Sequence, residues 1–231
     1  MSKFNTISLD AADTLFFIKD GLGDSYNKIL KKYSNNYESR DISNSFKNFF
    51  NSRKGLHFSG LTGRNLVAAE KKWWYELVFD VFNELGMIDD FDSYFDDLYE
   101  FFAKDAWEIF EDTLPFLEEA KKRNFKLIVT SNFDSRIYNV CEHFGISKYI
   151  DCFTISSESG SSKPDPNFFY KSLSNANASL ENTLHIGDNP KLDFLAAKEI
   201  GLACYLIDRD KDNSPSENRI NSLNCIWDLI C

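Results

Sequence analysis

Four short stretches of the sequence carry polar side chains that could bind a metal ion and a phosphate group. These side chains belong to Asp10, Ser131, Asn132, Lys163, Asp188 and Asp193. Carboxylate oxygens are the ligands that Mg²⁺ prefers in proteins, and hydroxyl and ammonium groups bind the oxygens of an anion. If the fold brings the four stretches together, they form a Mg²⁺ site beside a phosphate site.

Each polar stretch lies beside a short apolar segment that has the length and composition of a buried strand. Five such segments occur, at residues 4–9, 125–130, 150–155, 183–186 and 203–207. Helical patterns separate them at residues 114–123, 136–144, 167–176 and 191–200. Strands that alternate with helices predict an α/β fold with a Rossmann-like, doubly wound parallel sheet. Because ligands bind at the carboxyl ends of the strands in such sheets, we expect the polar stretches to meet at one edge.

Residues 15–110 follow a different pattern, with helical periodicity and no convincing strand. One helix face is formed by Val67, Trp74, Val78, Val81 and Leu85, which recur at helical spacing. Further helix candidates lie at residues 21–33, 41–52 and 91–102. We therefore predict an α/β core domain formed by residues 1–16 and 108–231, with a helical unit inserted at residues 17–107.

Three other features have simple structural interpretations. Asp13 is expected to cap a turn or helix. Trp73 and Trp74 are expected in the core of the helical insert rather than in a substrate-binding wall, because their neighbours repeat at helical spacing. Residues 210–218 are predicted to form a polar loop.

The composition limits the partners that the chain can have. The net charge is -10, which gives no support for nucleic-acid binding, since neutralising phosphates needs clustered Lys and Arg. No apolar run approaches the roughly 18–20 residues that span a bilayer, and no targeting peptide is evident, so we expect a cytoplasmic protein without a membrane partner. The five cysteines form no C-x-x-C pair and the three histidines do not cluster. We therefore expect reduced thiols and no His/Cys metal site.

The four polar stretches resemble, in order and at suitable separations, the four motifs of the haloacid dehalogenase-like hydrolase superfamily. Single pieces, such as an aspartate after a strand, are common, whereas four in order are a strong signal. Residues 10–14, 73–74, 131–134, 163–166 and 187–189 further resemble the subgroup named haloacid dehalogenase-like hydrolase domain-containing protein 3. The helical insert is placed like the cap of that superfamily, so the resemblance implies that residues 17–107 form a helical cap domain.

The resemblance implies a nucleophile and a metal site. Asp10 would attack phosphorus and form an aspartyl-phosphate, a covalent route that divides one difficult step into two. Mg²⁺ would be held by Asp10, the backbone carbonyl of Ala12 and Asp188, with Asp193 in support.

The remaining motif residues are implied to bind the substrate, a small phosphorylated molecule. Ser131 and the backbone of Asn132 would bind phosphoryl oxygens. Lys163 would offset the negative charge of the nucleophile and the phosphate, and Thr14 would orient the loop that carries the nucleophile.

One position departs from the pattern of the phosphatases in this superfamily. They carry a second aspartate two residues after the nucleophile, which protonates the leaving oxygen and then activates water. This chain has Ala12 there, and general acid–base assistance is typically worth about 10²–10⁴ in rate. Asp13 lies one residue further on and should point elsewhere. The resemblance thus implies a phosphatase of low activity, or one selective for leaving groups that need no proton.

Two alternatives stay open. The first is chemistry with a carbon or halide leaving group, as in the dehalogenases and the phosphonoacetaldehyde hydrolases of the superfamily. The latter have alanine at this position and use a cap lysine as a Schiff base, for which the candidates by location are Lys28, Lys32, Lys47 and Lys54. Against a dehalogenase, the Asp188 and Asp193 pair makes little sense without Mg²⁺. The second alternative is a binding or regulatory protein that keeps the phosphate and Mg²⁺ pocket without turnover.

Overall fold

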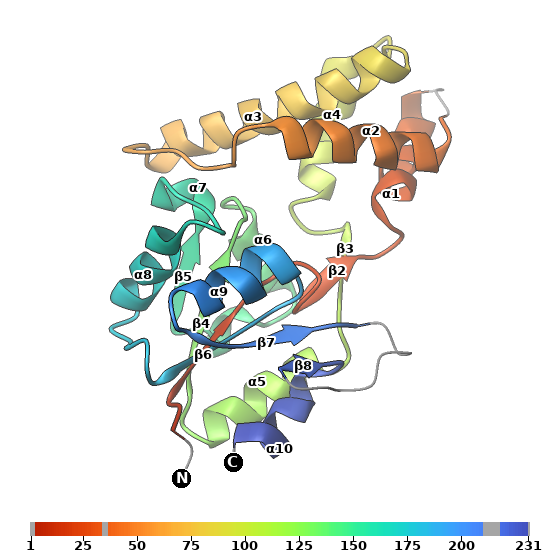
Figure 1. Cartoon of the computed structure of the whole chain (residues 1–231). Coiled ribbons are helices and arrows are strands. Elements are labelled where there is room, and N and C mark those ends of the chain that lie inside the picture. The colour runs from red at the N-terminus through yellow and green to blue at the C-terminus, as the bar shows by residue number, and fades with distance from the viewer. Residues whose placement is uncertain (1–2, 34–36, 210–217, 231) are drawn as a thin grey trace.

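A six-stranded parallel sheet forms the centre of the protein, with strand order β5-β4-β1-β6-β7-β8 (Figure 1). The structure is a computed structural model that describes residues 3–33, 37–209 and 218–230. Its strands are β1 (Thr6–Leu9), β4 (Lys126–Ser131), β5 (Cys152–Ile155), β6 (Thr183–Gly187), β7 (Ala203–Ile207) and β8 (Arg219–Ile220). The α/β fold predicted from the sequence is therefore confirmed, and each of the five predicted strands is present.

Helices cover both faces of the sheet. One face packs against α5 (Thr113–Lys122), α6 (Ile137–His143) and α10 (Ile226–Ile230) in a single apolar cluster that includes Leu9 and Val129. The other face carries α8 (Pro166–Asn175) and α9 (Ala196–Glu199), which contribute Phe169 and Ala197 to a smaller cluster. Alternate strand residues point to opposite faces, so both helix layers are anchored by the same short strands.

The helical insert has an apolar core of its own. Its helices are α1 (Leu22–Leu30), the short 3-10 helix η1 (Lys31–Tyr33), α2 (Ser39–Ser52), α3 (Gly63–Leu85) and α4 (Phe91–Phe101). Leu30, Val81, Phe82 and Tyr94 are buried among them, in a cluster separate from those of the sheet. In Figure 1 the insert lies above the sheet and its flanking helices. Of the described helices, none combines the length and the apolar character that crossing a membrane requires.

Two short strands correct the expectation that residues 15–110 contain none. β2 (Phe16–Ile18) pairs antiparallel with β3 (Trp107–Ile109), and Phe16 lies opposite Ile109. Three residues are too few to produce a periodic signal in the sequence. Their pairing also joins the two ends of the insert, which lie far apart along the chain.

A second correction concerns the helix expected at residues 191–200. The segment begins as a π-helix, η3 (Pro190–Leu195), and continues as α9. Its start is fixed by the Asn189 side chain, which accepts hydrogen bonds from the backbone N–H groups of Lys191 and Leu192. The remaining short helices are η2 (Ser147–Tyr149), α7 (Ser156–Ser159) and η4 (Leu223–Cys225). Except for Asn218, the polar loop predicted at residues 210–218 lies outside the described residues, as does Cys231.

Candidate active site

Four of the predicted site residues lie together at the carboxyl ends of β1 and β6. Carboxylate oxygens of Asp10, Asp188 and Asp193 lie within 4.8 Å of one another. Lys163 Nζ donates to Asp10 Oδ1 at 2.8 Å and to Asp193 Oδ1 at 2.6 Å. The strand order explains this meeting, because β1 and β6 are direct neighbours in the sheet.

Burial makes the charges of this group strongly dependent on one another. Burial alone would lower the pKa of Lys163, but the carboxylates of Asp10 and Asp193 outweigh it and raise that pKa. The pKa of the Asp188 carboxyl is raised to about 8, mainly by burial and next by the negative charge of Asp10. Repulsion between carboxylates held this close together is what a bound cation would offset.

Asp193 holds Lys163 in place. Its Oδ1 accepts from Lys163 Nζ and lies 3.0 Å from His185 Nε2, while its Oδ2 accepts from the backbone N–H of Asn189. The carboxylate also lies against the backbone of Gly187, where an added Cβ would be only 2.3 Å from Asp193 Cγ. Gly187 is therefore needed for this close approach, a role that sequence reasoning did not assign.

A buried chain of polar side chains supports Asp193 from behind. Ser8 Oγ lies 3.0 Å from His185 Nδ1 and 2.8 Å from Thr130 Oγ1, which in turn lies 2.6 Å from Ser172 Oγ. From the sequence, His185 is considered only as a metal ligand, and this supporting role is missed. The sequence could have indicated this network, because Ser8, Thr130 and His185 each lie in the interior of a buried strand. A buried polar side chain must find a hydrogen-bond partner.

Asn132 joins two of the predicted motifs. Its side-chain amide donates to the backbone carbonyl of Lys163 at 2.8 Å, and its Oδ1 accepts from the backbone N–H of Lys163 at 2.7 Å. Ser131 is buried at the end of β4, directly before it. Thr14 is not brought to the cavity described below: it is fully buried, and its carbonyl accepts from the Arg209 guanidinium. Asp13 lies in the turn before β2, and a capping role of its side chain stays a prediction.

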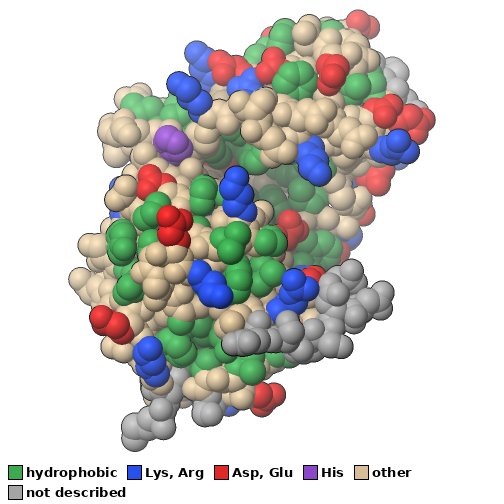
Figure 2. Space-filling model, viewed as in Figure 1, with side chains coloured by type: hydrophobic (Ala, Val, Ile, Leu, Met, Phe, Trp, Pro, Cys, Tyr) green, Lys and Arg blue, Asp and Glu red, His purple; other side chains and the backbone are tan. Residues whose placement is uncertain are grey.

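A cavity of about 700 Å³ lies between the helical insert and the ends of the strands. Figure 2 shows the hollow between the two parts of the molecule, with hydrophobic side chains inside it. Ala12, Asn132 and Lys163 line the cavity from the sheet side. Trp74 packs against the core of the insert, as predicted, but it also lines the cavity together with Trp73. Assigning both tryptophans to the core alone was therefore incomplete.

Comparison with known proteins places the chain in a family. A family model described as haloacid dehalogenase-like hydrolase matches residues 4–201. The chain belongs to the haloacid dehalogenase-like hydrolase family. The match spans both the sheet and the insert, and it confirms the resemblance inferred from the motifs.

Individual relatives agree with this assignment. Haloacid dehalogenase-like hydrolase domain-containing protein 3 of Bos taurus is 26% identical over 228 residues, covering 94% of this chain and 90% of that protein. The rhythmically expressed gene 2 protein of Drosophila melanogaster is 27% identical over 221 residues, covering 90% and 84%. The solved structure of the HAD-hydrolase YfnB from Bacillus subtilis has a TM-score of 0.78 at 15% identity, covering 98% of both chains, and shares the fold.

In this haloacid dehalogenase-like hydrolase, helix α3 of the insert contacts the loop after Asn132 directly. Trp74 Nε1 donates to Asp134 Oδ2 at 2.5 Å, and the backbone N–H of Ser135 donates to Glu70 Oε1 at 3.1 Å. Asp134 is fully buried and also accepts from the Arg136 guanidinium at 2.6 Å. The position of the insert is therefore coupled to the loop that follows Ser131 and Asn132.

We predict that Asp134→Ala is strongly destabilising. The substitution leaves the Arg136 guanidinium buried without its carboxylate partner, which typically costs about 3–5 kcal/mol. Asp97→Ala is the matched control, because the ion pair of Asp97 with Lys32 is exposed and worth about 0–1 kcal/mol. Urea unfolding measures both free energies, and equal losses in the two variants would contradict the prediction.

Proposed function

We propose that this chain is a Mg²⁺-dependent hydrolase that acts on a small phosphorylated molecule through an aspartyl-phosphate. One observation carries the proposal: Asp10 lies beside Asp188 and is ion-paired with the buried Lys163, and Lys163 lines a cavity large enough for a small molecule. A nucleophilic carboxylate, a second metal-ligating carboxylate and a fixed ammonium group are the parts that such a reaction needs.

The donor atoms fit a hard divalent cation. Asp193 has both carboxylate oxygens engaged by protein donors, so we assign the direct ligands to Asp10, Asp188 and the backbone carbonyl of Ala12, with Asp193 in support. When bound, Mg²⁺ supplies the positive charge that offsets the carboxylates and the phosphoryl oxygens. The structure of the Bacillus subtilis protein is described as bound to magnesium, which supports the same choice of ion here.

The chain's own residues divide the chemistry among them. Asp10 attacks phosphorus, the bond from phosphorus to the ester oxygen breaks, and the organic group leaves as its alkoxide or phenoxide. Water then cleaves the aspartyl-phosphate, which releases phosphate and restores the Asp10 carboxylate. Lys163 stays protonated beside Asp10 and offsets the charge of the incoming phosphoryl group. Ser131 and the Asn132 backbone bind phosphoryl oxygens. The methyl group of Ala12 cannot donate a proton to the leaving oxygen, so we expect low activity or selectivity for oxygens that leave as stable anions.

We further propose that residues 17–107 act as a cap on a core formed by residues 1–16 and 108–231. The cavity that the insert shares with Ala12 and Lys163 supports this, since a cap excludes water and gates access to the site. We place the protein in the cytoplasm, with a small phosphorylated molecule as its partner and with no nucleic-acid or membrane partner.

Mg²⁺ at millimolar concentration is predicted to raise the thermal unfolding midpoint of the wild-type protein. A ligand that binds only the folded state at about 100 times its Kd adds roughly 2.7 kcal/mol. Asp188→Asn should lose this gain, whereas Asp89→Asn, which changes an exposed acid of the insert, should keep it. Thermal melts with and without Mg²⁺ decide the matter, and an identical response of Asp188→Asn and wild type would refute the metal assignment.

A substrate panel tests the proposed function as a whole. Activated aryl phosphates, alkyl phosphates and phosphonoacetaldehyde are assayed with Mg²⁺ and with a chelator. The proposal expects Mg²⁺-dependent release of phosphate from at least the activated aryl ester. Release that persists in the chelator would contradict it.

Cleavage of a carbon–phosphorus bond is the second candidate, and one observation favours it. Of the four lysines considered for a Schiff base, Lys54 lines the cavity. Lys28 and Lys32 are instead ion-paired with acids, Asp20 and Asp97. Turnover of phosphonoacetaldehyde that is lost in Lys54→Met would favour this candidate.

A further inference from the structure

The insert presents an aromatic wall to the cavity, formed by Phe46 and Phe50 of α2 and by Trp73 and Trp74 of α3. Three of these rings are nearly parallel. The planes of Phe46 and Phe50 differ by 15°, those of Phe46 and Trp74 by 16°, and those of Phe50 and Trp74 by 28°. Such a set of rings offers flat faces on which another ring can stack.

Part of this aromatic wall is left uncovered by the protein. The Phe50 side chain is 44% exposed, and both tryptophans are half-buried. A large apolar side chain exposed inside a concave cavity is a binding feature more often than a packing one. A ligand that covers Phe50 would remove its apolar surface from water.

The polar lining of the cavity suits a hydroxyl-rich ligand poorly. Asp134 is the one acidic residue among the described lining residues, and both of its oxygens already accept hydrogen bonds from Arg136, one of them also from Trp74. The side-chain oxygens of Asn132 and Asn189 are also engaged by backbone N–H groups. Among the described lining residues, a sugar would therefore find no free carboxylate to accept from its hydroxyl groups.

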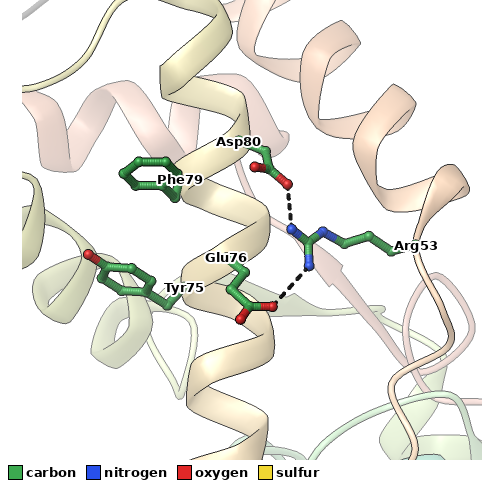
Figure 3. A pocket seen from close by; sticks show the side chains of 5 residues that line it. All are labelled: Arg53, Tyr75, Glu76, Phe79 and Asp80. Atoms are coloured by element: carbon green, nitrogen blue, oxygen red, sulfur yellow. Dashed lines mark hydrogen bonds and ion pairs between the residues drawn. The ribbon is translucent and has the colours of Figure 1, made fainter.

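The charge of the lining suits an anion. Its basic residues are Arg53, Lys54, Arg136, Lys163 and Lys191. Arg53 is held by Glu76 and Asp80 on one side of α3, with the Tyr75 and Phe79 side chains pointing to the other side (Figure 3). Among the described residues, Lys54 and Lys191 make no ion pair, which leaves two positive charges for a ligand.

We infer that the substrate is a phosphate monoester whose organic part is a planar aromatic ring that stacks on the aromatic wall. The inference rests on the proposed function, because it places the phosphate at Lys163 and Asp10. The volume of about 700 Å³ accommodates a ring and a phosphate group. Ala12 is a second, independent reason to expect an aryl phosphate. Its side chain cannot act as a general acid, and an aromatic alcohol leaves as a stable anion that needs none.

Calorimetry of the full chain with Mg²⁺ tests the inference, using inorganic phosphate, phenylphosphonate and cyclohexylphosphonate. The two phosphonates carry the same headgroup and equal numbers of carbon atoms, and differ in the flat ring. We expect phenylphosphonate to bind about fivefold to tenfold more tightly than cyclohexylphosphonate. Phe50→Leu should remove most of this preference and leave the affinity for inorganic phosphate unchanged. Phe79→Leu, which changes a 40% exposed ring outside the cavity, should keep the preference.

Each other outcome overturns a defined part of the argument. Equal affinities for the two phosphonates, with phosphate still bound, overturn the aromatic substrate and leave the proposed function standing. A preference that survives both Phe50→Leu and Phe46→Leu overturns the assignment of the ring to this wall. Failure of phosphate and both phosphonates to bind overturns the proposed function, and the inference with it.

Discussion

Ala12→Asp is expected to raise the rate of alkyl phosphate hydrolysis by up to about 10²–10⁴, the gain typical of a positioned general acid. The rate for an activated aryl phosphate should rise much less, because its leaving oxygen needs no proton. Ala12 lines the cavity beside Asn132 and Lys163, so a carboxyl group at this position has room to face the substrate. The measurement is kcat/KM for a matched alkyl and aryl pair in both proteins.

Ala12→Asn is the control for this experiment, since it has nearly the shape of the aspartate variant but no carboxylic proton. Two results would count against the phosphatase proposal. If Ala12→Asp leaves every phosphate ester unaffected while the wild type cleaves phosphonoacetaldehyde, the carbon–phosphorus candidate is correct. If nothing turns over in either form, yet phosphate and Mg²⁺ bind, the chain is a binding protein built on an enzyme scaffold.

Asp10→Asn is expected to abolish turnover of every substrate, with a loss on the order of 10⁴–10⁶ in kcat, as for removal of a covalent nucleophile. Asp13→Asn is the matched control three residues away, because Asp13 lies exposed in the next turn. Mass spectrometry after acid quenching adds a readout independent of rate: a phosphorylated protein should accumulate in wild type and in Asp13→Asn. A labelled protein in Asp10→Asn would mean that another residue is the nucleophile.

The sheet and the meeting of the motifs could be predicted because both follow from local signals. Buried parallel strands contain runs of apolar residues, and β4, with Leu127, Ile128 and Val129 in succession, shows this clearly. Once a parallel sheet is inferred, side chains that follow neighbouring strands must meet at one edge. The meeting of Asp10 and Asp188 is therefore a consequence of topology, whereas Lys163, which follows α7 after the edge strand β5, reaches them only through the path of its loop. Their chemical roles stay predictions.

Contacts that depend on register or on the placement of the insert could not be predicted. His185 meets Ser8 because β1 and β6 align those two residues, and no local pattern gives that alignment. The hydrogen bond from Trp74 to Asp134 depends on how the insert sits over the sheet. The residues of the cavity wall could not be predicted for the same reason, since they come from the four helices α1–α4 of the insert, from η3, β2 and β3, and from several loops.

The pairing of β2 with β3 brings the two chain connections between the insert and the core side by side. Because Phe16 lies opposite Ile109, the chain leaves the core and returns to it at the same place. The helices between β2 and β3 are topologically one long hairpin loop. Surface loops tolerate replacement by loops of different length. The polar residues at the strand ends and the aromatic wall of the insert are thus encoded in separate stretches of sequence. An exchanged insert would replace the upper wall of the cavity, and it would have to supply new partners for Asp134 and Ser135, which now bind Trp74 and Glu70.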